Sequence, residues 1–226
     1  EAYFPYAFAA EAYAAKGLYD EARAVLEGYL TVFGDNAEIL RPLAGNSLVQ
    51  GKYDLALKDL DKVFRVFPGQ DLNHRVKGDV HHLRGDFLEA ETEYRILCGS
   101  AEKPARLVGR IGLMLLSLSR GQFKQAQEEA KRGIELCQEL DDKWNESNLH
   151  WSLGYIHIRI RDPAAAITEL EKARKVAEMD GGIFLQISAL DLKGLALLEM
   201  GSVPQAQATA VEIEKLVGDW LACPIW

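Results

Sequence analysis

The residues in this chain best suited to chemistry are its five histidines. His81 and His82 are adjacent, and His150 and His157 lie two turns apart on one face if their segment is helical. Histidines placed in this way suggest a metal site or a pH sensor. A zinc site, however, favours ligands at positions i and i+4 of one helix or a cysteine nearby. We therefore expect these histidines to pack between helices, with a metal or pH-sensing role as the alternative.

The sequence carries none of the usual enzymatic signatures. It has no glycine-rich phosphate loop, no HExxH, no GxSxG and no paired-cysteine motif. Carboxylates are numerous but scattered, whereas catalysis requires a nucleophile, a base and an orienting group in one site. We predict a protein that is not an enzyme, with no catalytic residues, no cofactor and no metal.

Composition narrows the class of partner. The chain has 226 residues, 48% of them apolar and 27% charged, as in a folded protein. A net charge of −8 argues against nucleic acid and anionic membranes, which require a basic face. Cys98, Cys137 and Cys223 are too few and too far apart for a disulfide framework, which favours reduced thiols and a cytoplasmic location. The longest apolar run, 107–119, is too short to span a bilayer.

The elements that position these residues follow from a repeated turn of the form Gly-x-aromatic-x-x-Ala. Glycine ends one helix in a left-handed conformation, the aromatic residue fills the wedge between paired helices, and alanine lets the second helix approach closely. The last two copies are looser, and in the fifth Asp162 followed by Pro163 gives an N-cap and first-turn signal for the second helix. The alanines that close the six copies, hereafter the repeat alanines, are Ala22, Ala56, Ala90, Ala126, Ala166 and Ala206. They lie 34, 34, 36, 40 and 40 residues apart.

Between the turns the apolar spacing is helical, and no stretch alternates with the period of a strand. We predict an all-α chain with helices at 3–15, 20–33, 37–50, 53–67, 71–84, 87–99, 104–120, 123–140, 144–160, 163–179, 183–200 and 203–217.

The 34-residue period, the Gly-x-Tyr/Phe-x-x-Ala turn and Pro68 closing the second unit resemble the tetratricopeptide repeat. Leu153 and Gly154 fit that family's signature, whereas His157 takes a tyrosine position. The resemblance implies a right-handed superhelical solenoid of antiparallel helix pairs that binds peptides and has no chemistry of its own. One array over 1–226 is expected, with units at 3–36, 37–70, 71–104, 105–143, 144–182 and 183–217, and a tail at 218–226. Because the chain begins without Met, we also expect a fragment of a longer protein.

The positions of the histidines and charged residues within the repeats indicate which of them are structural. His74 and His81 occupy the same two positions in the third unit as His150 and His157 in the fifth, which favours packing. Seven basic residues lie between Lys103 and Arg132, and we interpret them as a solvated face, with a docking patch for an acidic segment as the alternative. The family's chaperone-type carboxylate clamp is not expected, because Ala7, Glu11 and Pro42 are among the residues at its positions.

The first helix of each pair faces the concave groove in that family. In the first three units the predicted groove is polar, with Glu11, Glu38, Arg41, Arg75, Asp79 and His82. In the last three it is apolar, with Val108, Ile111, Leu115, Leu118, Trp151, Tyr155, Ile158, Leu192 and Leu195. Arg159, Asp191 and Glu199 lie at its margins.

The helix predicted over 104–120 is apolar on more than one face, and such a helix should be covered by another part of the chain or by a partner. We expect a protein-interaction scaffold, a regulatory or sensor segment of a larger protein, that holds a peptide or helix over Leu115, Trp151 and Tyr155. Two alternatives stay open. The groove is filled by a second copy or the tail in a self-assembling array, or it takes a small apolar effector.

Overall fold

The computed structural model describes residues 3–69 and 71–221, and the regular structure in them is α-helical. The helices are α1 (Phe4–Ala15), α2 (Tyr19–Phe33), α3 (Ala37–Val49), α4 (Tyr53–Val66), α5 (Leu72–Arg84), α6 (Phe87–Cys98), α7 (Lys103–Ser119), α8 (Phe123–Leu140), α9 (Lys143–Arg159), α10 (Pro163–Met179), α11 (Ile183–Glu199) and α12 (Val203–Leu221). The predicted all-α fold is therefore confirmed, with helix ends within one residue of those expected for all helices but the last.

The last helix was predicted to end at residue 217, and this was wrong. Helix α12 continues through Gly218 to Leu221. A single glycine in a helix costs only about 1 kcal/mol relative to alanine, so it does not have to end one. Residues 218–221 of the predicted tail are thus helical, and its remainder, 222–226, including Cys223, lies outside the described residues.

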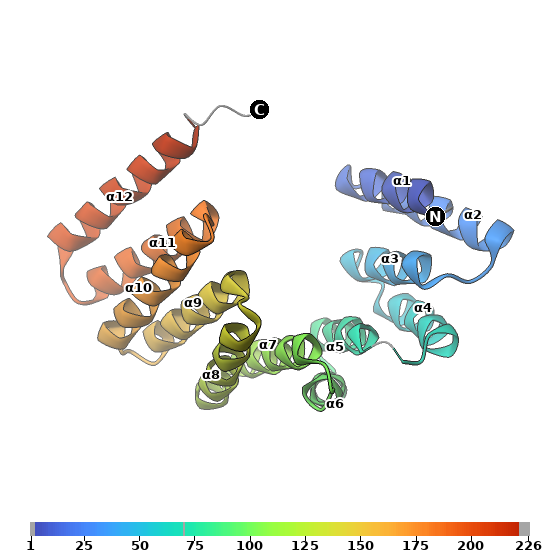
Figure 1. Cartoon of the computed structure of the whole chain (residues 1–226), viewed down its shortest axis with the longest axis horizontal. Helices are drawn as coiled ribbons and strands as arrows, with labels where there is room; N and C mark the ends of the chain where they lie inside the picture. Colours follow the sequence, from blue (N-terminus) through green and yellow to red (C-terminus); the bar gives the residue numbers. More distant parts are fainter. Residues whose placement is uncertain (1–2, 70, 222–226) are drawn as a thin grey trace. The chain divides into compact units, whose positions relative to one another are not determined.

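The helices form two compact units, each of three antiparallel pairs (Figure 1). Unit 1 spans Glu1–Ala101 and contains α1 to α6, and unit 2 spans Glu102–Trp226 and contains α7 to α12. Within unit 2 each helix packs against the next, and α9 also contacts α11 directly. We describe each unit on its own, so the single continuous array stays a prediction.

The turns inside the pairs have the conformation that their sequence predicts. Gly17, Gly51, Gly85, Gly121 and Gly201 have φ between 68° and 93°. In the fifth copy Arg161 takes the glycine position and has φ 64°, although it has a side chain. The Asp162 carboxylate then accepts a hydrogen bond from the Ala165 backbone N–H at 3.1 Å, and Pro163 opens α10.

The core follows the repeat. The first five repeat alanines are at most 1% exposed, which lets paired helices approach closely. Gly154 in α9 shows how closely, because a Cβ added there would lie 2.5 Å from Cγ of Leu170 in α10.

A row of largely buried acids, which we call the acid row, runs through the repeats three residues after the repeat alanine. Its members are Asp59, Glu93, Glu129 and Glu169, and each meets a base. Glu93 and Glu169 accept from Nδ1 of His74 and His150 at 2.6 and 2.7 Å, and Glu129 accepts from Arg110 at 2.8 Å. Buried carboxylates require such partners, since desolvation of an unpaired charge is costly.

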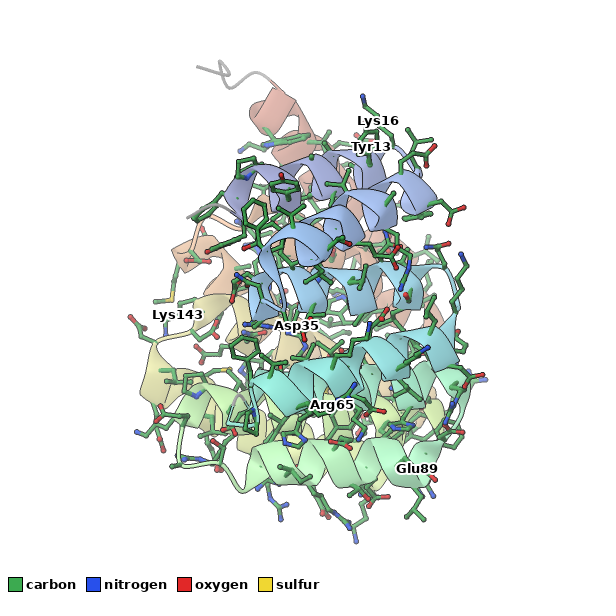
Figure 2. The ribbon with its side chains drawn as sticks, turned by 90° about the vertical axis from the view of Figure 1, so that its right-hand side faces the viewer. Tyr13, Lys16, Asp35, Arg65, Glu89 and Lys143 are labelled. Atoms are coloured by element: carbon green, nitrogen blue, oxygen red, sulfur yellow. The ribbon has the colours of Figure 1, made fainter. Side chains whose placement is uncertain are left out.

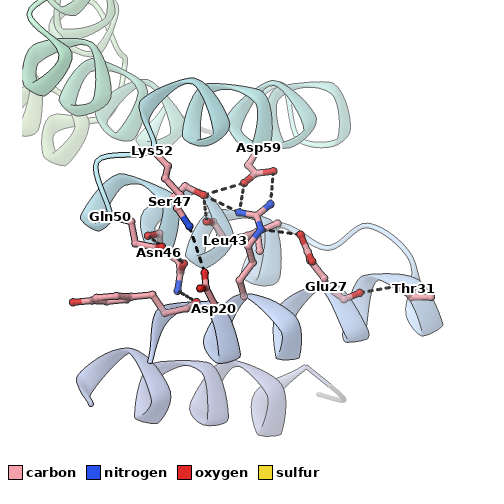
Figure 3. Close-up of polar contacts among 11 residues, drawn as sticks. Asp20, Glu27, Thr31, Leu43, Asn46, Ser47, Gln50, Lys52 and Asp59 are labelled. Atoms are coloured by element: carbon pink, nitrogen blue, oxygen red, sulfur yellow. Dashed lines mark hydrogen bonds and ion pairs between the residues drawn. The ribbon is translucent and has the colours of Figure 1, made fainter. Parts of the chain in front are cut away.

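Asp59 is the most deeply buried member of the acid row. The Arg23 guanidinium donates to Asp59 at 3.0 Å and to Ser47 Oγ at 2.8 Å, which joins α2, α3 and α4 (Figure 3). The charged side chains of Lys16, Arg65 and Glu89 lie on the surface instead (Figure 2). Unit 1 therefore combines a solvated exterior with a buried ion pair that ties successive helix pairs together.

Candidate functional site

The candidate site is the face of unit 2 formed by α7, α9 and α11, the first helices of its three pairs. Leu115, Tyr155 and Leu195 lie on these helices at the same position, eleven residues before the repeat alanine. Leu115 and Leu195 are nearly half exposed, and Tyr155 is partly buried. They form an accessible apolar row across the unit, one residue from each first helix. We call this row and its neighbours on the same helix face the apolar face.

Helix α9 carries a ladder of flat side chains along the apolar face. The rings of Trp151 and Tyr155 are nearly parallel, 7° apart in plane, with centroids 6.0 Å apart. Arg159 extends the ladder by one turn, with its guanidinium carbon 5.9 Å from the centre of the Tyr155 ring. Trp151 Nε1 donates to the Ser188 carbonyl oxygen at 3.1 Å, which fixes the indole against α11. The ladder is thus anchored at Trp151 and open at Arg159.

The other predicted groove residues divide between surface and core. Ile111 and Leu118 pack at the edge of the cluster formed by α7, α8 and α9, and Trp151 and Leu192 edge the cluster next to it. Val108 is half-buried. Ile158 is only 7% exposed, because α11 covers it. The structure therefore places Ile158 in the core rather than on a surface that a partner could contact.

Two exposed aromatic residues extend the apolar face and were missed from the sequence. Trp144 lies seven and eleven residues before Trp151 and Tyr155, and so shares their side of α9. Phe184 takes the same position in α11 and is 72% exposed. The 40-residue spacing between the last repeat alanines was the signal that could have found both.

The equivalent positions in unit 1 are small or polar. The position of Leu115, Tyr155 and Leu195 is taken there by Glu11, Gly45 and Asp79. Glu11 is exposed, while Asp79 accepts from the Tyr94 hydroxyl at 2.7 Å. Burial, with a smaller contribution from Asp79, raises the pKa of Tyr94. This hydroxyl therefore stays protonated and donates to the carboxylate.

The remaining predicted polar residues of unit 1 also make contacts within the chain. Arg41 donates to Glu38 at 2.7 Å, and the Arg75 guanidinium lies 3.6 Å from Asp79. His82 packs edge-on against Phe87, and burial lowers its pKa. Much of this polar surface is therefore engaged internally.

A hollow of about 320 Å³ lies between α1, α2 and α3, and it was not predicted from the sequence. Small side chains such as Ala7, Ala14 and Gly45 open it, and Glu11 lies on its wall. Pro42 also lines it. Positions that carry the family's carboxylate clamp thus form an apolar hollow in this chain.

Several histidines and three of the seven bases from Lys103 to Arg132 pair with acids inside the chain. His74 and His150 bind the acid row, and His81 Nδ1 lies 3.2 Å from Asp86. In residues 3–69 and 71–221 no three His, Cys, Asp or Glu side chains gather closely enough to hold a metal ion. Between Lys103 and Arg132, three bases pair with acids of α8: Lys103 with Glu139, and Arg110 and Arg132 with Glu129.

The fold and this face define the class of protein: a helical-repeat protein built from antiparallel pairs. Residues 46–105 match the family model described as tetratricopeptide repeat. The twelve described helices fit about six tandem tetratricopeptide-repeat units. No helix in the described part of the chain is long and apolar enough to cross a membrane.

Solved structures share this fold at low sequence identity. BtubC from P. vanneervenii is 12% identical with a TM-score of 0.73, covering 100% of this chain and 95% of that one. PilW, a type IV pilus biogenesis factor, is 15% identical with a TM-score of 0.72, covering 95% and 93%. A signal transduction ATPase with a tetratricopeptide repeat sensor from Pyrococcus horikoshii is 14% identical with a TM-score of 0.70, covering 87% of this chain and 32% of that one. No curated protein sequence matches this chain.

Proposed function

We propose that unit 2 binds an apolar segment of a partner protein along the apolar face, and that the chain acts as a non-catalytic scaffold in a larger regulatory protein. Tetratricopeptide repeats are generally protein-interaction scaffolds. The observation that carries the proposal is the row of exposed Leu115 and Leu195 with partly buried Tyr155 between them, at one repeat position on three helices. Accessible apolar side chains aligned in this way are typical of a docking surface.

The dimensions of the row favour a helix or an extended segment over a single side chain. Packed helices lie about 10 Å apart, so a row that crosses three helices should span at least about 20 Å, which is about 13 residues of helix at a rise of about 1.5 Å. Tyr155 provides a large, rigid contact at its centre, and Trp144 and Phe184 lie about three turns earlier on the same sides of α9 and α11. Arg159 is exposed at the margin and is suited to an acidic residue of the partner.

Peptide selection tests this proposal. Displayed peptides of about 15 residues, slightly longer than the row, are selected on the wild-type chain, and the affinities of the winners are measured for the L115S/Y155S variant. We expect at least roughly a tenfold loss of affinity, with the melting temperature little changed because these side chains are not core. Leu88→Ser on the outer surface of α6 removes an exposed leucine elsewhere and should leave binding unchanged. Peptides that bind wild type and L115S/Y155S equally would refute the proposal.

The hollow in unit 1 supports a second candidate function, the sensing of a small apolar effector. Its volume of about 320 Å³ is at the lower end of ligand pockets. A panel of small apolar molecules should raise the melting temperature if one binds. Gly45→Val would project into the hollow without a neighbouring contact and should abolish that rise. A rise that persists in Gly45→Val would place the ligand elsewhere.

A further inference from the structure

A cleft of about 380 Å³ lies between α11 and α12 in unit 2. Its walls are mostly apolar, with Leu195 and Leu198 from α11 and Ala210 and Ile213 from α12. Val211, beside it on α12, is 64% exposed. No described helix of the chain follows α12 to cover this cleft.

The preceding helix pair shows what such a cleft holds. Between α9 and α10, the next first helix, α11, packs against Ala166 and Leu170 with Leu192 and Ala196. Leu192 and Ala196 lie fourteen and ten residues before their repeat alanine. The same two positions in α5 are Val76 and Val80, which pack against Ala56 and Leu60 in unit 1. Both units therefore cover this type of cleft with the same two positions of a first helix.

The exposure of equivalent residues reports whether the cleft is covered. Ile158 of α9 is 7% exposed beneath α11, whereas its counterpart in α11, Leu198, is 53% exposed. Leu170 is 1% exposed, whereas its counterpart Ala210 is exposed. Within the described residues, the α11–α12 cleft is thus a repeat interface without its second half.

Helix α1 presents the missing half. Its residues at the two covering positions are Phe8 and Ala12, and both are exposed, Phe8 by 68%. Phe4 and Ala15 lie on the same side of α1 and are exposed too. The opposite side of α1 packs on α2 and α3 through residues such as Ala10.

The two surfaces are complementary in size. Within unit 2, Leu192 of the covering helix packs near Leu170 of the covered one. At the free surfaces the covering residue is the larger Phe8 and the covered residue is the smaller Ala210. A bulky side chain therefore meets a small one, which conserves the volume between the helices.

They are complementary in polarity as well. The interface between α10 and α11 contains an ion pair between Glu171 and Lys193. At the free surfaces the equivalent residues are Val211 and Ala9, so both charges are replaced by apolar groups. The two free surfaces thus differ from the α10–α11 interface in matching ways, which favours a second copy of this chain over an unrelated partner.

We propose that copies of this chain stack head to tail, with α1 of one copy packed in the α11–α12 cleft of the next. Because each copy contributes a different surface, the contact is heterologous and leaves one free surface at each end, so assembly continues into open chains. This inference goes beyond partner binding on the apolar face: the cleft shares Leu195 with that face, but Phe8 and Ala210 are not part of it.

Sedimentation over a range of concentrations tests the proposal. The wild-type chain should associate from its 25.2 kDa monomer into a ladder of larger species. Phe8→Glu places a charge on α1, and Ala210→Glu places one in the cleft. Each should weaken self-association by roughly 100-fold or more, because a buried unpaired charge is costly, while the circular dichroism spectrum stays helical. Leu88→Glu, on the exposed surface of α6, is the control and should still assemble.

An equimolar mixture of the two variants gives the sharpest result. Phe8→Glu retains an intact cleft and Ala210→Glu retains an intact α1, so the mixture should form a heterodimer that grows no further. A wild-type chain that stays monomeric at all concentrations would overturn the proposal. A two-fold dimer that Phe8→Glu leaves intact, or a mixture that stays monomeric, would overturn it equally.

Discussion

Gly154 and Gly194 occupy the same repeat position, twelve residues before the repeat alanine, but their surroundings differ. A Cβ at Gly154 would lie 2.5 Å from Cγ and 2.7 Å from Cδ2 of Leu170. A Cβ at Gly194 would meet nothing within 4 Å, because Ala210 replaces the leucine. The same substitution should therefore have opposite effects at the two sites.

The magnitudes follow from two opposing contributions. Glycine to alanine in a helix stabilises by about 1 kcal/mol. Overpacking a filled core costs about 1–3 kcal/mol, and a contact this short against fully buried Leu170 lies at the upper end of that range. Gly154→Ala should thus lower the free energy of unfolding by about 2 kcal/mol, and Gly194→Ala should raise it by about 1 kcal/mol.

Urea unfolding at low protein concentration measures both changes, and a double-mutant cycle identifies their cause. In a Leu170→Ala background, which recreates the surroundings of Gly194, Gly154→Ala should stabilise by about 1 kcal/mol. The coupling between the two sites is then about 3 kcal/mol. Equal effects at Gly154 and Gly194, or a cycle without coupling, would refute the packing argument.

Three further predictions concern single residues. Arg161→Gly should raise the free energy of unfolding by about 1 kcal/mol, because a left-handed conformation costs about 1–2 kcal/mol for a residue with a side chain. Gly121→Arg at the equivalent turn should lower the free energy of unfolding by a similar amount. Urea midpoints equal to that of the wild type would contradict both expectations. Burial opposes ionisation of Glu169, but hydrogen bonds, first from Lys172, lower its pKa. The stabilising effect of the Glu169 carboxylate is therefore present above its unfolded pKa of about 4.3 and lost as the pH falls through the lower folded pKa. In Glu169→Gln the free energy of unfolding should fall less steeply as the pH is lowered over this range. Burial, with help from nearby acids, raises the pKa of the Cys137 thiol to about 12, so it should react with thiol reagents at mildly alkaline pH only after unfolding; rapid labelling of the native chain would contradict this.

The helices could be predicted from the sequence because their signals are local. Glycines such as Gly121 require a left-handed turn, and Asp162 and Pro163 mark a helix start, so the starts of α8 and α10 need no knowledge of the rest of the chain. Gly218 is the exception, because α12 continues through it.

The candidate site was less predictable because exposure depends on neighbouring helices. Ile158 and Leu115 have similar apolar character, but α11 covers Ile158, whereas Leu115 stays accessible. For unit 1 the sequence predicts a groove of charged residues, whereas small residues such as Ala7 and Gly45 open the hollow. An absent side chain leaves no signal in a pattern of charge or hydropathy.

The acid row also limits how such a gene can grow by tandem duplication. His74 with Glu93, Arg110 with Glu129, and His150 with Glu169 each have both partners in one helix pair, so copying that pair copies the whole interaction. Asp59 differs, because its guanidinium comes from Arg23 in the preceding pair, one residue after the repeat alanine. A duplicated second pair would follow α4, which has Leu57 at that position, so the new aspartate would lack the arginine that α2 supplies. As far as the acid row is concerned, pairs three to five can therefore be copied one at a time, whereas the first two pairs must be copied together.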